Sequence, residues 1–285
     1  AGNVIGEPMC RDTAAAVALA AALVKARDPK AVFAILTADH VIKDLPLFQT
    51  TLSTGMDLAE AGNELVTIGI APTEPSTAYG YIERATLKED REGCRFYRAV
   101  RFVEKPDRER ATSYLATGNY LWNSGMFIWS VAAIEAALLK HRPALGSLVE
   151  VLAEAAQTSN LESSLASIYP TLEKISIDYA VMEKADNILV AEGRFDWDDV
   201  GSWTAIENHF PKDASGNVVV GESAAWQASG NIVVSKDRVT ALVGVKDLVV
   251  VQAEGVTLVC HRDQAQNIKK LLETIRQTGQ HTELL

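Results

Sequence analysis

Three short segments of the chain place charged or amide side chains beside glycine, proline or aromatic residues at the edge of an apolar run. These segments are Phe102–Pro106, Tyr120–Phe127 and Trp197–Trp203. An α/β sheet presents its ligand-binding side chains at the ends of its strands. The three segments are therefore the first candidates for a binding or catalytic site.

Carboxylates in two regions could bind a cation. Asp39 directly follows the apolar run 31–36, at the carboxyl end of a predicted strand, where such folds bind ligands. A helix cap or a turn is the alternative role for Asp39. Residues 196–199 contain three acids in four positions. Because unpaired carboxylates repel one another, at least one of them is expected to meet a cation or backbone donors.

Glu104 and Lys105 stand at the end of a predicted strand that Pro106 stops. Neighbouring side chains on a strand point to opposite faces, so these two need not form an ion pair. A solvated strand end is the alternative, and the local pattern alone favours it.

Asn123 and Gly80 are candidates for contact with a sugar. Asn123 offers an amide donor and acceptor between the aromatic Trp122 and Gly125, a glycine that permits close approach. Sugars are commonly bound by such mixtures of amide and apolar groups. Gly80 lies between two tyrosines, and a simple turn glycine is its alternative role.

Helical and strand patterns alternate along the first part of the chain. The continuous apolar runs 31–36 and 65–70 predict strands that are buried on both faces. Alternation of helices with such strands implies βαβ units and a mostly parallel sheet. Helices are predicted over 12–27, 46–61, 107–116 and 131–141, further strands over 94–104 and 126–131, and a loop over 72–81.

The pattern changes near Pro211–Asn217, beyond which short apolar runs recur between turn residues. Such spacing predicts a small β-rich unit, resembling a few coils of a β-helix. We expect two domains, residues 1–212 and 213–285, and because the second is small it should pack on the first or on a second subunit. Its predicted strands are 217–220, 231–234, 239–244, 247–252 and 256–260, followed by a helix over 263–277.

Composition limits the possible partners. The formal net charge of −10 argues against nucleic acid, which requires a basic face, but a single lysine or a divalent cation can still hold a nucleotide. Neither a membrane-spanning apolar run nor a secretory signal is recognisable. The three scattered cysteines indicate neither disulfides nor a zinc site, so a reducing cytoplasm is expected.

In this order, the three segments resemble the nucleotidyltransferases that make sugar nucleotides, most closely mannose-1-phosphate guanylyltransferase (GDP-mannose pyrophosphorylase). The resemblance implies a Rossmann-like nucleotide-diphospho-sugar transferase fold with a small C-terminal β-helix-like domain. It also implies GTP and mannose 1-phosphate as substrates, GDP-mannose and pyrophosphate as products, and Mg²⁺ as cofactor. Related short proteins carry a β-helical tail at a dimer contact, so a homodimer is expected.

The resemblance also assigns roles to single residues. Catalysis would depend on Lys105, which would meet a phosphate, and on Asp39 and Asp199, which would bind Mg²⁺ together. The residues that would contact the sugar are Gly80, Glu104, Asn123 and Asp178, although Asp178 could instead cap a helix over 178–184.

The segment Glu7–Ala14 resembles the family sequence Glu-Pro-x-x-Arg-Asn-Thr-Ala, which lies near the nucleotide base and ribose. The match implies nucleotide contacts for Glu7, Arg11 and Thr13. Asp12 departs from the pattern, since the family usually has asparagine there.

One family signature is not found in the sequence. The family begins with a strand and a loop of the form Gly-Gly-x-Gly-Thr-Arg-Leu-x-Pro, whose backbone amides bind the triphosphate. We therefore expect that the sequence is part of a longer protein, that about 60 residues are missing, and that residues 1–285 alone are inactive. The alternatives are another sugar-1-phosphate nucleotidyltransferase, for glucose or a heptose, and a non-catalytic regulatory relative that binds a sugar nucleotide.

Overall fold

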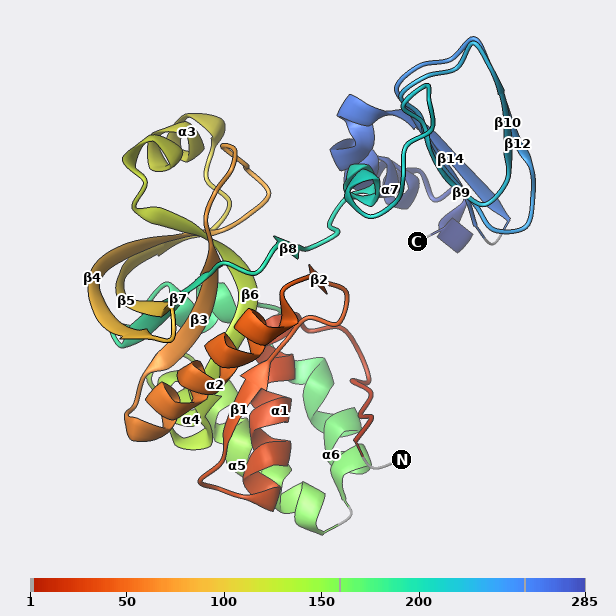
Figure 1. The fold of residues 1–285 in the computed structure, drawn as a ribbon. Coiled ribbons are helices and arrows are strands. Elements are labelled where there is room, and N and C mark those ends of the chain that lie inside the picture. The colour runs from red at the N-terminus through yellow and green to blue at the C-terminus, as the bar shows by residue number, and fades with distance from the viewer. Residues whose placement is uncertain (1–2, 159, 254, 285) are drawn as a thin grey trace. The chain divides into compact units, whose positions relative to one another are not determined.

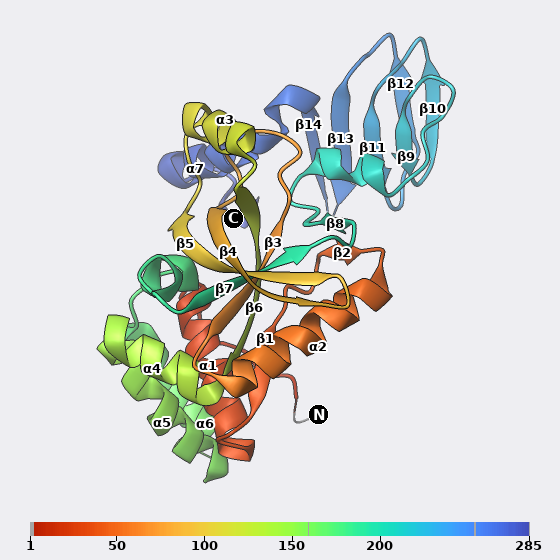
Figure 2. The ribbon, with the colours of Figure 1, turned by 60° about the vertical axis from the view of Figure 1, so that its left-hand side comes forward.

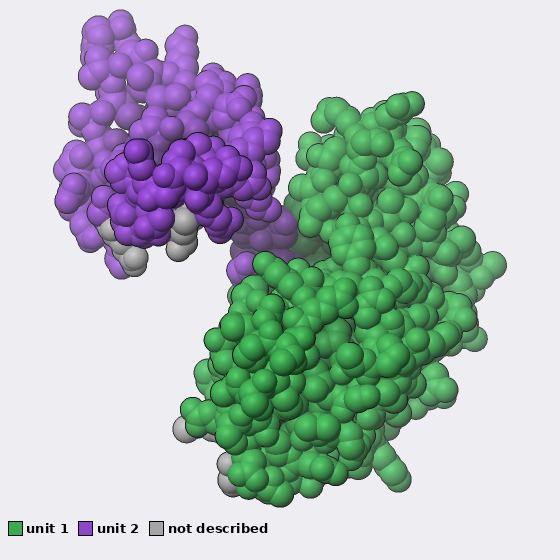
Figure 3. Space-filling model, turned by 180° about the vertical axis from the view of Figure 1, so that it is seen from behind, with its two compact units in different colours: residues 1–38, 42–197 green, residues 39–41, 198–285 purple. Residues whose placement is uncertain are grey.

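The computed structural model describes residues 3–158, 160–253 and 255–284. The chain forms two compact units, one made of residues 1–38 and 42–197, the other of residues 39–41 and 198–285 (Figure 3). The division between the units falls at residues 197 and 198, whereas the composition changes near residue 212. Within the described residues, no helix combines the length and the apolar character that crossing a membrane requires.

A six-stranded sheet in the order β1-β6-β3-β7-β5-β4 forms the centre of the first unit (Figures 1 and 2). Its strands are β1 (Val32–Ile35), β3 (Leu65–Ile70), β4 (Tyr81–Arg91), β5 (Cys94–Val103), β6 (Tyr120–Ser130) and β7 (Ile188–Gly193). The unit is mixed α/β, as predicted, but the prediction of a mostly parallel sheet is wrong. Among the described pairings in this sheet only β3 with β7 is parallel. The reason is that β6 runs antiparallel between β1 and β3, and a two-residue turn makes β4 and β5 a hairpin.

Helices cover both faces of this sheet and bury two apolar clusters (Figure 2). On one face the Ala-rich helix α1 packs closely with its neighbours because its buried side chains are small. Helix α2, which begins after the capping residue Asp44, covers the other face. The helices of this unit are α1 (Thr13–Arg27), α2 (Leu45–Ala61), α3 (Arg108–Thr117), α4 (Val131–His141), α5 (Pro143–Gln157) and α6 (Leu161–Ile168), with short helices η1 (Tyr169–Thr171) and η2 (Asp178–Met182).

Strands β4 and β7 were not predicted, and strands β1 and β6 differ from their predictions. Strand β1 was expected to be buried on both faces, but it is half-buried, because it lies at the edge of the described sheet. Strand β6 begins six residues before the predicted start, at Tyr120. Asn123 therefore lies inside a strand. Gly125 interrupts β6 with a φ of 72°, a conformation that favours glycine.

The second unit contains stacked parallel strands. Strands β9 (Val218–Val220), β11 (Ile232–Ser235) and β13 (Leu248–Ala253) pair in parallel, and β14 (Val256–His261) pairs antiparallel with β13. A second parallel pair is formed by β10 (Ser223–Trp226), which was not predicted, and β12 (Thr240–Val243). This arrangement confirms the predicted β-helix-like domain. The remaining elements of the chain are β2 (Val41–Ile42), β8 (Trp197–Asp198), η3 (Trp203–Asn208), η4 (Arg262–Asn267), α7 (Ile268–Thr278) and η5 (Thr282–Leu284).

Two stacked asparagines join successive coils of this unit. The Asn217 Oδ1 atom accepts hydrogen bonds from the backbone N and the Nδ2 of Asn231, each at 2.9 Å. Asn231 in turn accepts from the Leu248 backbone N at 3.0 Å and donates to the Val245 carbonyl at 3.3 Å. Both asparagines are buried, so these bonds satisfy polar groups that would otherwise destabilise the interior.

Candidate functional site

Five of the predicted site residues come together in the first unit: Gly80, Glu104, Lys105, Asn123 and Asp178. We call these five residues the Asn123 cluster. The Asn123 Nδ2 atom donates to Asp178 Oδ1 at 2.8 Å, and its Oδ1 atom accepts from the Gly125 backbone N at 3.1 Å. Its backbone N donates to the Gly80 carbonyl at 2.8 Å. The amide is therefore fixed in orientation on one side by a carboxylate and on the other by the backbone of its own strand.

Gly80 packs closely against Glu104 and has no unusual backbone angle. A Cβ atom at this position would lie 2.5 Å from Glu104 Oε2 and 3.4 Å from the Asn123 Cβ. Real Cβ atoms essentially never come that near. Gly125 shows the reverse, since its φ is 72° and a Cβ there would meet open space. The close contact within the protein is therefore at Gly80, whereas the approach of a ligand to Gly125 stays a prediction.

Glu104 and Lys105 form an ion pair, with Lys105 Nζ 2.9 Å from Glu104 Oε1. Their expected separation on opposite faces of a strand does not occur, because β5 ends at Val103. Lys105 then adopts a φ of 41°, in the left-handed region. The hydrogen bond to Glu104 raises the pKa of the Lys105 ammonium, against the opposing effect of burial. The lysine therefore remains a cation next to the two carboxylates of the cluster.

Asp178 has the most perturbed carboxyl group of the cluster. Burial and then the charge of Glu104 raise its pKa to about 6, while hydrogen bonds from Asn123 and its own backbone, and the charge of Lys105, oppose the shift. A half-buried carboxylate that has a raised pKa and contacts an amide is typical of a functional site.

The residues predicted to contact the nucleotide make bonds that hold the N-terminal segment in place. The Arg11 side chain donates to the carbonyl of Tyr169 at 2.9 Å and also to that of Pro170. Thr13 Oγ1 accepts from the Ile177 backbone N at 2.8 Å, so the start of α1 is tied to the residue that precedes Asp178. Burial, and then the nearby charge of Glu7, raise the pKa of the Tyr169 hydroxyl. A role of these residues in nucleotide binding stays a prediction.

Asp39 and Asp199 belong to the second unit. Burial lowers the pKa of His40, and the charges of Asp39, Asp199 and Asp198 oppose this shift, so all three carboxylates lie near the imidazole. Asp199 Oδ1 also accepts from the Gly201 backbone N at 3.2 Å. The described residues contain no group of three or more histidine, cysteine or acidic side chains arranged to hold a metal. Two carboxylates completed by substrate phosphates would still suit Mg²⁺, which prefers oxygen ligands.

Sequence reasoning missed the partners of Asp198. Its carboxylate accepts from the Val200 backbone N at 2.8 Å, from Asn208 Nδ2 at 3.0 Å, and is 2.9 Å from His209 Nε2. Although burial acts in the opposite direction, these bonds hold the pKa of Asp198 below its ordinary value. The run of acids at 196–199 indicated that one of them needed donors, but no local pattern pointed to Asn208 or His209.

The chain belongs to the nucleotidyl transferase family, whose family model matches residues 2–216. Residues 216–275 match the MannoseP isomerase/GMP-like beta-helix domain. The family and the fold class expected from the three motifs are thus both confirmed.

Individual relatives agree with this assignment. A mannose-1-phosphate guanylyltransferase of Escherichia coli is 39% identical over 282 residues, which are 99% of this chain and 59% of that protein. One of Klebsiella pneumoniae is 38% identical, over 96% of this chain and 58% of that protein. The chain thus spans about three fifths of the length of these relatives. A crystal structure described as mannose-1-phosphate geranyltransferase from Thermus thermophilus is 35% identical, covers 95% of this chain and 77% of the other, and has a TM-score of 0.79.

Proposed function

We propose that this chain acts in the synthesis of GDP-mannose and pyrophosphate from GTP and mannose 1-phosphate. The observation that carries the proposal is the Asn123 cluster. It combines two carboxylates that can accept hydrogen bonds from sugar hydroxyls, an amide and a lysine, in a chain of the nucleotidyl transferase family. Curated relatives at 39% and 38% identity are named mannose-1-phosphate guanylyltransferase. The identity of the sugar, mannose, and that of the base, guanine, are both part of the proposal.

Within this proposal the cluster binds the sugar phosphate. The carboxylates of Glu104 and Asp178 accept hydrogen bonds from sugar hydroxyls, and the Asn123 amide, held by Asp178, contributes to the same face. The Lys105 ammonium faces the phosphate, since a cation next to two carboxylates can exchange its partner for an anionic ligand. A phosphate oxygen of the sugar phosphate then attacks the α-phosphorus of GTP in line, a reaction in which positioning and electrostatics supply most of the catalysis.

Asp39 and Asp199 would hold Mg²⁺, in keeping with their all-oxygen donor set and with the effect of both charges on His40. When bound, the cation would neutralise the charge that develops on the phosphates. The three bonds to Asp198 hold the residue adjacent to Asp199, so the backbone that presents the Asp199 carboxylate is fixed before a ligand arrives.

Calorimetric titration of residues 1–285 with mannose 1-phosphate tests the proposal. We expect binding that Lys105→Ala weakens strongly for the phosphorylated sugar, whereas free mannose should bind the two proteins alike. Lys88→Ala is the matched control, because Lys88 is an exposed lysine in β4 of the same unit. Failure of mannose 1-phosphate to bind, or equal binding by Lys105→Ala, would refute the assignment. Preference for glucose 1-phosphate would change the sugar but keep the class of reaction.

A further inference from the structure

The connection that carries Glu104 and Lys105 is short and strained. It consists of residues 104–107, between the end of β5 at Val103 and the start of α3 at Arg108. Lys105 has a φ of 41°, which is unfavourable for a residue with a side chain. Such a conformation persists only where the surrounding structure holds both ends of the segment. The β4–β5 ladder holds the end at Val103, which pairs with Tyr81.

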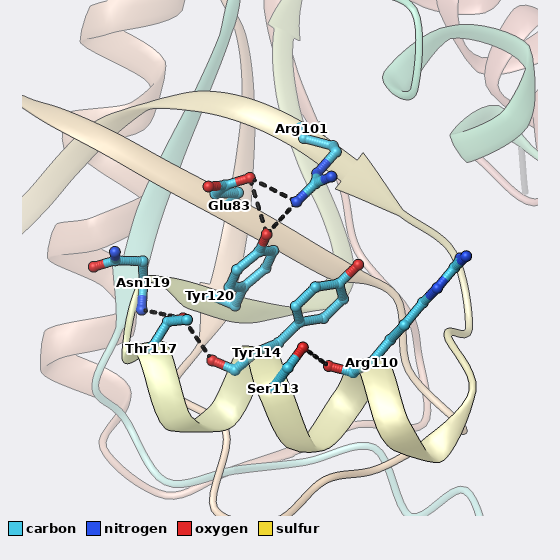
Figure 4. A network of polar contacts seen from close by, with 8 residues as sticks. All are labelled: Glu83, Arg101, Arg110, Ser113, Tyr114, Thr117, Asn119 and Tyr120. Atoms are coloured by element: carbon cyan, nitrogen blue, oxygen red, sulfur yellow. Dashed lines mark hydrogen bonds and ion pairs between the residues drawn. The ribbon is translucent and has the colours of Figure 1, made fainter.

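Helix α3 has little buried apolar surface with which to hold the other end. Ala111 is its one fully buried residue. Its main aromatic anchor is Tyr114, whose ring stacks on that of Tyr120 in β6 at 4.0 Å between centroids and 15° between planes (Figure 4). The same ring lies 5.5 Å from that of Tyr81. The Tyr114 stack therefore attaches α3 to the sheet.

Arg101 and Glu83 complete this attachment from the sheet side (Figure 4). The Arg101 guanidinium lies 5.9 Å from the centroids of both stacked rings and 3.0 Å from Glu83 Oε2. It also donates to the Tyr120 hydroxyl, which donates to Glu83 Oε2 at 2.9 Å. Arg101 in β5 lies directly opposite Glu83 in β4 in the register of the two strands. We call Glu83, Arg101, Tyr114 and Tyr120 the α3 clamp.

Two residues of the α3 clamp flank the strained connection along the chain. Arg101 lies on β5, three residues before Glu104, and Tyr114 lies on α3, nine residues after Lys105. Tyr114 also packs in one apolar cluster with Trp122, the neighbour of Asn123. Motion of α3 away from the sheet would therefore release the backbone of residues 104–107. Asn123 and Asp178 would keep their positions, because they lie on β6 and η2.

We propose that Tyr114 and Arg101 are positioning residues that hold Glu104 and Lys105 in the sugar-phosphate site through the α3 clamp. Neither side chain belongs to the Asn123 cluster, and both act through the connection. The part of the inference that concerns the ligand rests on the proposed function. The part that concerns the conformation of residues 104–107 does not.

The test uses Tyr114→Ala and, as a second variant that keeps the ring stack, Arg101→Gln. Tyr114→Phe retains the stack and serves as the conservative rescue. Ser113→Ala is the matched control, because Ser113 is the exposed neighbour of Tyr114 and its hydroxyl bonds within α3 to the Arg110 carbonyl. For each protein we measure the binding of mannose 1-phosphate by calorimetry and the hydrogen exchange of the backbone amides of residues 104–110, except Pro106, which has no amide hydrogen.

We expect Tyr114→Ala and Arg101→Gln to weaken mannose 1-phosphate binding about threefold to tenfold, the range that the loss of one aromatic or cation–π contact implies. Amide exchange at residues 104–107 should accelerate in both. Tyr114→Phe and Ser113→Ala should match the wild type. In a background that carries both Glu104→Ala and Lys105→Ala, Tyr114→Ala should cost little further affinity, because its effect passes through these two residues.

Unchanged exchange at residues 104–107 in Tyr114→Ala and Arg101→Gln would overturn the inference. So would an equal loss of affinity whether or not Glu104 and Lys105 are both present, since that result indicates a general structural defect. If the wild type does not bind mannose 1-phosphate at all, the proposed function fails, and hydrogen exchange still decides whether the clamp holds the connection.

Discussion

Replacing Asp178 with asparagine should make the protein more stable at neutral pH while weakening its ligand site. The substitution keeps the shape of the side chain and leaves an oxygen that can accept the hydrogen bond from Asn123 Nδ2, which is 2.8 Å long with the native carboxylate. It removes the negative charge that burial and Glu104 disfavour. Loss of this charge should stabilise the folded protein and weaken the binding of the sugar.

The size of the stability effect follows from the pKa of Asp178. This pKa rises from an ordinary value of 3.8 to about 6 on folding, so the folded protein binds the proton more tightly than the unfolded chain does. The contribution of Asp178 to stability is therefore greatest below pH 4 and is lost as the pH rises through about 6. The difference corresponds to about 3 kcal/mol at neutral pH. Asp178→Asn should recover up to that amount at pH 7 and almost none below pH 4.

The same substitution should reduce affinity for mannose 1-phosphate. A carboxylate accepts from sugar hydroxyls on both oxygens, whereas the NH2 group of asparagine donates only. Loss of one hydrogen bond to a charged group corresponds to roughly tenfold to a hundredfold in affinity. Greater stability together with poorer binding is the pattern expected when a functional group is held at a cost to folding.

Urea unfolding at a series of pH values from 4 to 8, followed by circular dichroism, measures the first effect, and calorimetry measures the second. Asp186→Asn is the control, because the Asp186 side chain is 83% exposed and its ion pair with Lys140 is long, at 3.6 Å. If Asp178→Asn were less stable than the wild type at pH 7, or if the gap did not close toward pH 4, the argument from burial would be wrong.

Three further substitutions test other parts of the structure. Gly80→Ala should displace the Glu104 carboxylate, since the new Cβ would lie 2.5 Å from its Oε2 atom. Calorimetry should then show at least about tenfold weaker mannose 1-phosphate binding. Unchanged affinity would show that the contact between Gly80 and Glu104 does not matter for the site. Asp199→Ala, in a protein that also contains the Gly-rich loop, should abolish Mg²⁺-dependent pyrophosphate release. It should change the free energy of unfolding by less than about 1 kcal/mol. Normal turnover at saturating Mg²⁺ would exclude a role of Asp199 in metal binding. Asn231→Ala should destabilise the second unit by about 2–4 kcal/mol, because its buried partners lose their hydrogen bonds; thermal unfolding measures this loss, and mannose 1-phosphate binding by the first unit should not change.

Features that depend on local sequence were predicted from the sequence alone. The helix expected over 12–27 is α1, Thr13–Arg27, and the strand expected over 65–70 is β3, because apolar periodicity and capping residues act within a few positions of the chain. The change in composition near residue 212 indicated a β-rich unit for the same reason. Motifs with a defined order were enough to indicate the family.

Features that depend on strand pairing required the tertiary structure. The apolar run of β1 does not reveal that the strand lies at the edge of the described sheet, nor does that of β6 reveal that it runs antiparallel between β1 and β3. Register between strands far apart in sequence places Glu83 beside Arg101, and no local pattern encodes it.

The candidate site divides in the same way. Glu104, Lys105 and Asn123 were identified from their residue types at the ends of apolar runs, since such chemistry is visible in the sequence. Their contacts were not predictable, because the bond from Asn123 to Asp178 joins residues 55 positions apart. Only the folded chain buries Asp178 next to Glu104, and this desolvation and like-charge repulsion set its pKa.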